Sequence, residues 1–344
     1  MMSNTTLQVA GVVAFYMCSA LVMVFVNKAV LISVPDLPLI FLLLQLLIAV
    51  VLLKVSALFA RGAIEIPRFE LETAKKLFPV VFVNIAGLVF NTLCLRGVDA
   101  SFFQIARGLV LPLTIVVSSM HTHTMPTSKV ILASIVVTMG FFLGVAPSSK
   151  IPLSAAPSLL SLAYGFLSSL FIAFHAVLIK MSLPYCNNSS IQLAWWTNAG
   201  SAAMLLPFAL LCGEVSALRS MEALPATFIW GTLVTGIFGF MLCLAGLLSI
   251  RVTSPITHMF SSAARSVLQT LIGVTYFGDL MTTNRATSII VILGGTMFYT
   301  WVKAVETAAA PTAHATDIEK GGGNADDESE EIVFMAKLDS EDRE

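Results

Sequence analysis

The sequence predicts an all-α membrane protein with ten transmembrane helices, arranged as two inverted repeats of five helices. Two observations predict the membrane class. Apolar residues make up 57% of the 344 residues and charged residues only 11%, whereas soluble proteins carry about 25% charged residues. Stretches without charge recur along residues 1–303 and exceed the roughly 20 residues that cross a bilayer. These features exclude the water-soluble enzyme folds, because such a chain cannot bury that much apolar surface.

The ten helices are expected where long apolar runs are bounded by charge, proline or glycine. The first run has no basic segment before it and no clear cleavage site, so it is interpreted as a membrane span and not as a signal peptide. The predicted helices lie near residues 8–32, 38–59, 77–95, 101–120, 129–147, 157–181, 190–212, 226–250, 253–277 and 285–303.

An even number of spans places both termini on the same side of the membrane. Eight Lys and Arg residues of the connections then fall on the side of the termini and four on the opposite side, which predicts cytosolic termini. The densest basic cluster, Arg61 to Lys76, agrees with this orientation. The two overlapping glycosylation sequons of Asn187 to Ser190 would then lie in the cytosol and stay unmodified.

A weak internal similarity predicts the inverted repeats. An offset of 158 residues aligns Phe102-Gln104-Ala106-Arg107 with Phe260-Ser262-Ala264-Arg265. The two helices are five apart, and an odd separation makes the second copy run inverted. The expected organisation is a first repeat at residues 1–152, a second at 153–305 and a disordered, acidic cytosolic tail at 306–344. Residues 304–344 hold 12 acidic against 3 basic side chains, which is typical of a solvated tail.

Besides Lys54 and Lys180, which lie near the cytosolic ends of their spans and can snorkel, three cations lie inside the predicted spans, whereas all acidic residues before the tail lie in connections or at helix ends. The cations are Lys28, Arg107 and Arg265. Each costs about 2.5–3.5 kcal/mol at the centre of a span. The two arginines therefore indicate a water-filled cavity whose ligand supplies negative charge, such as a phosphate group. Lys28 fits the same role, but snorkelling to the membrane surface is the alternative.

Polar side chains recur on faces of several predicted helices, as expected for a lined cavity. Each of them alone is equally explained by an interhelical hydrogen bond worth about 0.6 kcal/mol. The candidate faces carry His258, Ser261, Ser262 and Arg265 on the ninth helix; Tyr164, Ser168, Phe171 and His175 on the sixth; Asn84 and Asn91 on the third; and Gln104 on the fourth.

Trp195 and Asn198 in the seventh helix combine an aromatic ring with an amide. Such a pair can stack on a nucleobase and hydrogen-bond its edge, although packing explains tryptophans equally well.

The sequence contains no P-loop and none of the H-E-x-x-H or G-x-S-x-G motifs, so an ATP-driven pump and an enzyme are not expected. The scattered cysteines and histidines predict no metal site, and we expect no cofactor and no nucleic-acid partner.

Several segments of the chain together resemble the nucleotide-sugar and triose-phosphate translocator branch of the drug/metabolite transporter superfamily, and within it Golgi GDP-fucose transporters. The resemblance covers about residues 15–305, and its most specific part is Ser254 to His258. It rests on Met23 to Lys28, Phe90 to Arg96, Gly140 to Val145, Thr253 to His258 and Ser262 to Arg265.

The resemblance implies ten helices in inverted repeats and an alternating-access cavity. GDP-sugar carriers of this family typically hold Phe-Tyr-Asn-Asn on helix seven, for guanine, and a Gly-Ala-Leu-Asn-Lys-like motif on helix nine. Those places hold Trp195 to Asn198 and Ser261 to Arg265 here. Helix seven thus has one amide fewer, while the change from Lys to Arg265 keeps the charge and adds a fork for phosphate.

The function that the resemblance implies is exchange of a cytosolic nucleotide sugar, with GDP-fucose favoured, for lumenal nucleoside monophosphate across the Golgi membrane; the endoplasmic reticulum is the second candidate location. The expected contacts are Arg107 and Arg265 with phosphate, Lys28 with phosphate or sugar, and Trp195 with Asn198 on the base. His258, Ser261 and Ser262 would contact the sugar diphosphate, and Asn91 and His175 complete the lining. The alternatives are a sugar-phosphate or triose-phosphate carrier and a non-transporting membrane scaffold. A homodimer is left open.

Overall fold

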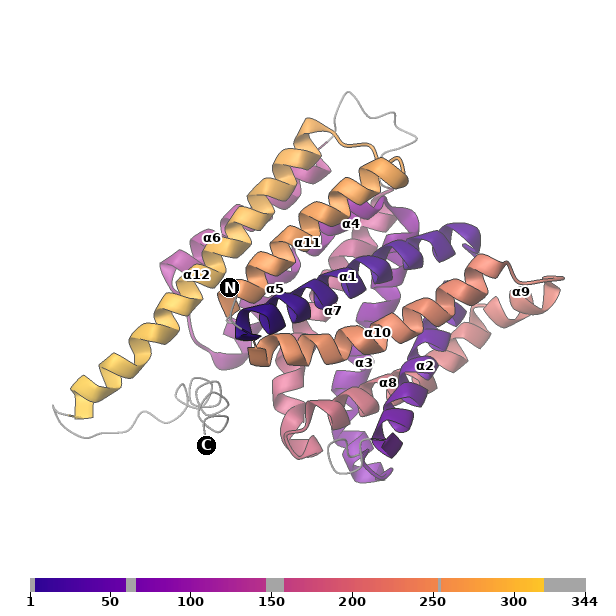
Figure 1. Cartoon of the computed structure of the whole chain (residues 1–344), viewed down its shortest axis with the longest axis horizontal. Coiled ribbons are helices and arrows are strands. Elements are labelled where there is room, and N and C mark those ends of the chain that lie inside the picture. The colour runs from indigo at the N-terminus through magenta and orange to yellow at the C-terminus, as the bar shows by residue number, and fades with distance from the viewer. Residues whose placement is uncertain (1–3, 60–65, 147–157, 253–254, 319–344) are drawn as a thin grey trace.

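The computed structural model describes residues 4–59, 66–146, 158–252 and 255–318, with side chains placed except at 4–10, 12, 243–263 and 307–318. These ranges fold into helices (Figure 1). The first half contains α1 (Asn4–Ser33), α2 (Pro38–Phe59), α3 (Leu71–Gly97), α4 (Ala100–Arg107), α5 (Val110–Thr122) and α6 (Ser128–Val145). The second half contains α7 (Leu159–Ser182), the 3₁₀ helix η2 (Leu183–Cys186), α8 (Ser190–Leu211), α9 (Glu214–Ser220), α10 (Ala226–Val252), α11 (Pro255–Tyr276) and α12 (Thr283–Ile318).

Every predicted helix has a counterpart in these elements, with three differences. The helix predicted at 101–120 is divided into α4 and α5, and the short α9 was not expected. The last helix extends to Ile318, past the expected start of the tail at 306. The rest of that tail, residues 319–344, lies outside the described residues.

The chain is an all-helical, multi-pass membrane protein. Within the described ranges, seven helical segments are long and apolar enough to cross a bilayer, or eight if α8 and α9, which meet at 68°, form one bent span. Large apolar side chains such as Leu211, Met139 and Ile290 are exposed on the outside of the bundle. This exposure fits a protein whose outer surface is in contact with lipid.

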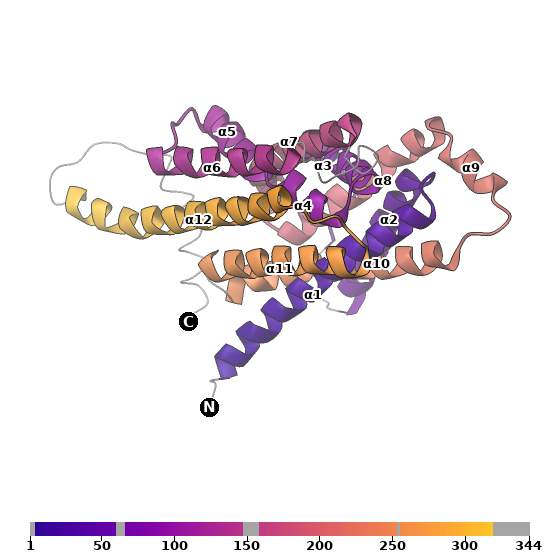
Figure 2. The same cartoon turned by 90° about the horizontal axis from the view of Figure 1, so that it is seen from above.

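The largest helix contacts join α6 to α12, α3 to α7, and α1 to α10. Helix α2 contacts both α8 and α10, and α3 contacts α8. In the view of Figure 2, α6, α12 and α11 follow one another in successive layers. The main apolar core includes residues from both halves, for example Phe41 of α2 and Phe228 of α10, whose ring centroids are 6.1 Å apart. The two halves therefore form one packed body.

One end of the bundle, which we call the Asp99 end, collects the end of α3 and the start of α4. Helix α1 ends there, because Lys28 contacts the last carbonyls of α3, and α12 begins there, because Arg285 pairs with Asp99. The first residue of α1 and the last of α12 consequently lie toward the opposite end.

The start of α2 at the Asp99 end is capped from the other half of the chain. The carboxylate of Glu214, at the first turn of α9, accepts hydrogen bonds from the backbone N–H groups of Leu39 and Ile40 at 2.8–3.1 Å. A carboxylate at this position satisfies N–H groups that have no partner within the helix and interacts favourably with its dipole.

Candidate functional site

Arg107 lies at the break in the fourth span. It is the last residue of α4, and α5 begins at Val110. The N–H of Gly108 donates to the carbonyl of Ile105 at 2.9 Å, a tighter turn than an α-helix makes. Pro112 has no N–H, so the helical bond to the carbonyl of Gly108 is missing. The break places the N-terminal dipole of α5 beside a guanidinium, an arrangement that attracts anions.

The Arg107 guanidinium makes no hydrogen bond and no ion pair with any part of the chain whose side chains the structure describes. Its contact is with the ring of Phe103, whose centroid lies 5.8 Å away. A guanidinium carries five N–H donors in a planar fork. Those donors are therefore available to a ligand that brings acceptor oxygens.

Arg265 of α11 lies close enough to Arg107 for the two positive charges to repel each other. Two hydrogen bonds join their helices: Gln104 of α4 donates to the hydroxyl of Ser266 at 2.8 Å, and Gln269 of α11 donates to the carbonyl of Ala100 at 3.0 Å. Each of these glutamines lies one turn from the arginine on its own helix. The crossing of α4 and α11 thus brings together the two arginines that the sequence identified 158 residues apart.

Tyr16 of α1 also interacts electrostatically with Arg107 and was not predicted. Nothing in the sequence around Tyr16 marks it as part of this group. The break at Gly108 was missed as well, although Gly108 and Pro112 within one apolar run were a usable signal.

Lys28 has a structural role in this conformation. It is buried, and its ammonium donates to the carbonyls of Leu95 at 2.9 Å, Arg96 at 3.5 Å and Val98 at 2.6 Å. A cation is favourable here, because the last carbonyls of α3 have no partner within the helix. The ammonium is thus occupied by backbone oxygens, and the predicted contact between Lys28 and phosphate or sugar stays untested.

The polar face predicted on the sixth span packs largely against α3. Phe90 of α3 stacks between Tyr164 and Phe171 of α7, with ring centroids 6.0 and 5.6 Å apart. The hydroxyl of Ser168 donates to the amide oxygen of Asn91 at 3.4 Å. The predicted lining residue Asn91 therefore lies at the interface of α3 and α7.

His175 of α7 and Trp195 of α8 each hold a buried nitrogen, Nε2 and Nε1 respectively, with no hydrogen-bond partner in the described part of the chain. Such a group costs free energy unless a partner reaches it. Both residues were predicted to contact the ligand. Because these two nitrogens have no hydrogen-bond partner, they are candidates for hydrogen bonds that form only when a ligand or water is bound.

The other aromatic and amide groups of α8 are engaged within the protein. Trp196 is buried, and its ring centroid lies 5.6 Å from Phe69 and 5.2 Å from Trp195. The amide of Asn198 donates to the carbonyl of Ala194 in its own helix at 2.7 Å. The amide oxygen of Asn198 therefore remains as the group that could accept a hydrogen bond from a nucleobase.

The remaining predicted residues are His258, Ser261 and Ser262. They lie in α11, but their side chains are outside the described residues, so the polar face that they form with Arg265 stays a prediction.

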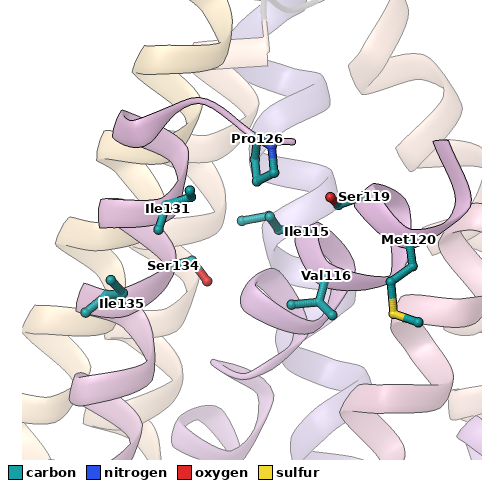
Figure 3. A pocket seen from close by; sticks show the side chains of 8 residues that line it. All are labelled: Ile115, Val116, Ser119, Met120, Pro126, Ile131, Ser134 and Ile135. Carbon is teal, nitrogen blue, oxygen red and sulfur yellow. The ribbon is translucent and has the colours of Figure 1, made fainter. Parts of the chain in front are cut away.

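A shallow pocket of about 240 Å³ lies between α5 and α6 and contains none of the predicted residues (Figure 3). Its walls are mainly apolar and include exposed Val116, Met120 and Ile131. This lining offers no charged group to a charged ligand. Within the described residues, no group of three His, Cys, Asp or Glu side chains could hold a metal ion.

Comparisons with known proteins concern the family and the fold of the chain. The model of the Triose-phosphate Transporter family matches residues 7–300. GDP-fucose transporter 1 of Mus musculus is 29% identical over 309 residues, covering 87% of this chain and 84% of the relative. GDP-fucose transporter 1 of Dictyostelium discoideum is 28% identical, covering 87% and 81%. The Golgi GDP-fucose transporter of Drosophila melanogaster is also 28% identical, covering 92% and 96%. A solved crystal structure shares the fold, with a TM-score of 0.50 and 12% identity over 83% of this chain and 96% of the other.

Proposed function

We propose that this chain, which belongs to the Triose-phosphate Transporter family, is a secondary antiporter that exchanges a cytosolic nucleotide sugar for a lumenal nucleoside monophosphate. The family makes it a membrane transporter and not an enzyme. GDP-fucose is the first cargo to test, because the relatives named above are GDP-fucose transporters.

The observation that carries the proposal is the pair of arginines on α4 and α11. The two positive charges repel each other, and a diphosphate bound between them would attract both and outweigh this repulsion. Arg107 and Arg265 are therefore the proposed phosphate contacts, each offering a fork that matches two phosphate oxygens. Because closing an empty cationic cavity is costly, reorientation is expected to be fastest with an anion bound, which favours exchange over one-way transport.

The remaining contacts of the proposal concern the base and the sugar. Trp195, with its orphaned indole nitrogen, and Asn198 would meet the base. His258, Ser261 and Ser262 would meet the sugar diphosphate from α11, and His175 would complete the lining. Lys28 is left out of the direct contacts, because backbone oxygens occupy its ammonium.

We also propose that residues 1–152 and 153–305 are inverted repeats, followed by a tail from 306. The pattern of helix contacts supports this. If α1, α2, α3, α4–α5 and α6 correspond to α7, α8, α10, α11 and α12, the contact of α3 with α7 corresponds to that of α10 with α1. The contact of α2 with α10 likewise corresponds to that of α8 with α3, and the contacts α6–α12 and α2–α8 correspond to themselves.

A Golgi membrane location with cytosolic termini completes the proposal. It is supported by the excess of basic residues on the side of the termini and by the similarity to the Golgi GDP-fucose transporter of Drosophila melanogaster. The placement of α1 and α12 supports termini on a common side.

The first experiment identifies the cargo by thermal shift of the purified protein. A ligand at 100 times its Kd stabilises the folded state by about 2.7 kcal/mol. The panel contains GDP-fucose, GDP-mannose, UDP-galactose, GMP, UMP and triose phosphate. Stabilisation by GDP-fucose and GMP supports the proposal. Stabilisation by triose phosphate alone would instead assign a sugar-phosphate carrier, which needs the cations but no base contact.

The second experiment measures exchange in proteoliposomes with Arg265→Ala. We expect exchange to be lost while the protein stays monodisperse. Arg219→Ala is the matched control, since Arg219 is exposed on α9, away from the candidate site. Exchange near the parental rate in Arg265→Ala would remove Arg265 from the site.

A further inference from the structure

The most buried charged side chain of the described residues is Arg285, at the start of α12. It is 2% exposed, and its Nη1 lies 3.0 Å from the carboxylate of Asp99, which directly precedes α4. The same nitrogen donates to the carbonyl of Leu280 at 2.8 Å, and the guanidinium lies 5.2 Å from the ring centroid of Phe102. In the sequence, Arg285 was counted only among the four basic residues of the connections on the side opposite the termini. The structure instead uses it to tie α12 to α4.

A second carboxylate reaches the start of α4 from the connection between α11 and α12. The backbone N–H of Ser101 donates to the carboxylate of Asp279 at 2.8 Å. Gly278 has a φ of +69°, which turns the chain back after α11 and brings the N–H of Asp279 to the carbonyl of Gly273 at 3.1 Å. Gly273 has no Cβ, and a Cβ there would lie 2.5 Å from the Asp279 carboxylate. The turn is thus shaped to deliver this carboxylate to α4.

These contacts lie at the Asp99 end, next to the candidate site. Asp99 and Ser101 belong to the first half of the chain, and Asp279 and Arg285 to the second. Helix α4 carries Arg107 two turns further into the bundle, and α11, which precedes Asp279, carries Arg265. The elements that hold the two proposed phosphate contacts are therefore the elements that the carboxylates tie together.

We propose that Asp99, Asp279 and Arg285 form a latch that closes the Asp99 end of the transporter and must separate before the site can open to that side. In the described residues, a polar contact at the opposite end is exposed to solvent. There the hydroxyl of Thr127 donates to the carboxylate of Glu306 at 2.7 Å. The latch side chains Asp279 and Arg285 are buried, whereas Asp99 is 39% exposed.

Polar contacts suit a closure that opens repeatedly. When the latch separates, water replaces each lost hydrogen bond, so the net cost of opening is modest. An apolar seal of the same area would expose its surface to water at each cycle. The partial exposure of Asp99 gives water access to the ion pair from the outset.

The purpose of the latch depends on the proposed transport function, but its test needs no cargo. Ser101 provides the reporter, because it is fully buried and its hydroxyl has no hydrogen-bond partner in the described part of the chain. Ser101→Cys is nearly isosteric and keeps the backbone N–H that Asp279 accepts. The rate of reaction with a sulfonated maleimide is measured in nanodiscs at position 101, by mass spectrometry of the peptide.

Asp99→Asn and Asp279→Asn, each in the Ser101→Cys protein, are expected to raise this rate about tenfold, the factor that corresponds to about 1.4 kcal/mol. Asp36→Asn is the matched control and should leave the rate within about twofold of the parent. Asp36 is an exposed carboxylate at the same end.

Cys186 reports on folding in the same molecules, because it is 1% exposed and lies in η2, beyond the end of α7, whose start contacts the Asp99 end through Ser161. Exposed Cys212 is the positive control for labelling. The proposal is supported if position 101 reacts faster while Cys186 stays protected. It is overturned if neither variant changes the rate at 101, or if Cys186 becomes reactive in parallel, since the contacts would then hold the fold and not a gate. A cargo screen that finds no ligand would count against the proposed function and leave this result intact.

Discussion

Arg107 and Lys28 are both cations inside candidate spans, and the structure predicts opposite consequences for removing them. Arg107→Ala removes a cation–π contact worth about 0.5–1 kcal/mol and relieves the repulsion with Arg265. The stability of the empty protein is therefore expected to change little. Lys28→Met removes the ammonium from three carbonyl oxygens. Since one hydrogen bond to a charged group contributes about 1.5–3 kcal/mol, this variant is expected to be clearly destabilised.

Ligand affinity is expected to show the reverse pattern: Arg107→Ala should bind the nucleotide more weakly than Lys28→Met does. Loss of one charge-assisted hydrogen bond to phosphate costs about 1.5–3 kcal/mol, or about a 10- to 150-fold rise in Kd. Arg107→Lys, which keeps the charge without the fork, should fall between Arg107→Ala and the parent. The assay is thermal unfolding with and without the nucleotide found in the cargo screen, read together with exchange in proteoliposomes.

The reasoning would be refuted if Arg107→Ala lowered the unfolding temperature of the empty protein as much as Lys28→Met does. It would also fail if Arg107→Ala bound nucleotide with parental affinity. Either outcome would mean that Arg107 holds the helices together and does not contact cargo.

Three further predictions follow from particular contacts. Gly273→Ala is expected to displace the Asp279 carboxylate and to destabilise the protein by about 1–3 kcal/mol, the usual cost of overpacking; Gly294→Ala, which meets no atom within 4 Å, is the control in the same thermal unfolding assay. Glu214→Ala should lose about 0.5–2 kcal/mol through the missing cap on α2, and Glu214→Gln, which retains one acceptor oxygen, should lose less; equal losses would show that packing dominates. Asn187, at the turn before α8, should carry no glycan when the protein is made in a eukaryotic cell, because the proposed orientation places it in the cytosol. A mobility shift on glycosidase treatment would show that the orientation is the opposite one.

Much of the fold follows from local composition. The apolar runs predicted the helices, because a chain that spans lipid must satisfy its backbone hydrogen bonds within each span. The division of the fourth span escaped this reasoning, since Gly108 and Pro112 leave the run as apolar as before. Helix α9 was missed because its seven residues are too few for a periodic pattern.

The candidate site was predictable only in part, because the role of a charge depends on distant contacts. Arg107 and Arg265 were identified as cations without nearby acids, and the structure brings them together. Lys28 was identified by the same rule, yet the carbonyls that occupy it lie 67 to 70 residues further along the chain. Arg285 was counted only among the basic residues of the connections, because its partner, Asp99, is 186 residues away in the sequence. No local pattern distinguishes these cases.

The crossing of α4 and α11 also has a consequence for biosynthesis. Each half of the polypeptide supplies one of the two arginines of the proposed anion site, so neither half alone would form it. If the proposal holds, the chain must be extended through α11 during synthesis before it can hold cargo, and a truncated product would enter the membrane without this activity. Nucleotide binding would then be a direct measure that the two halves have assembled.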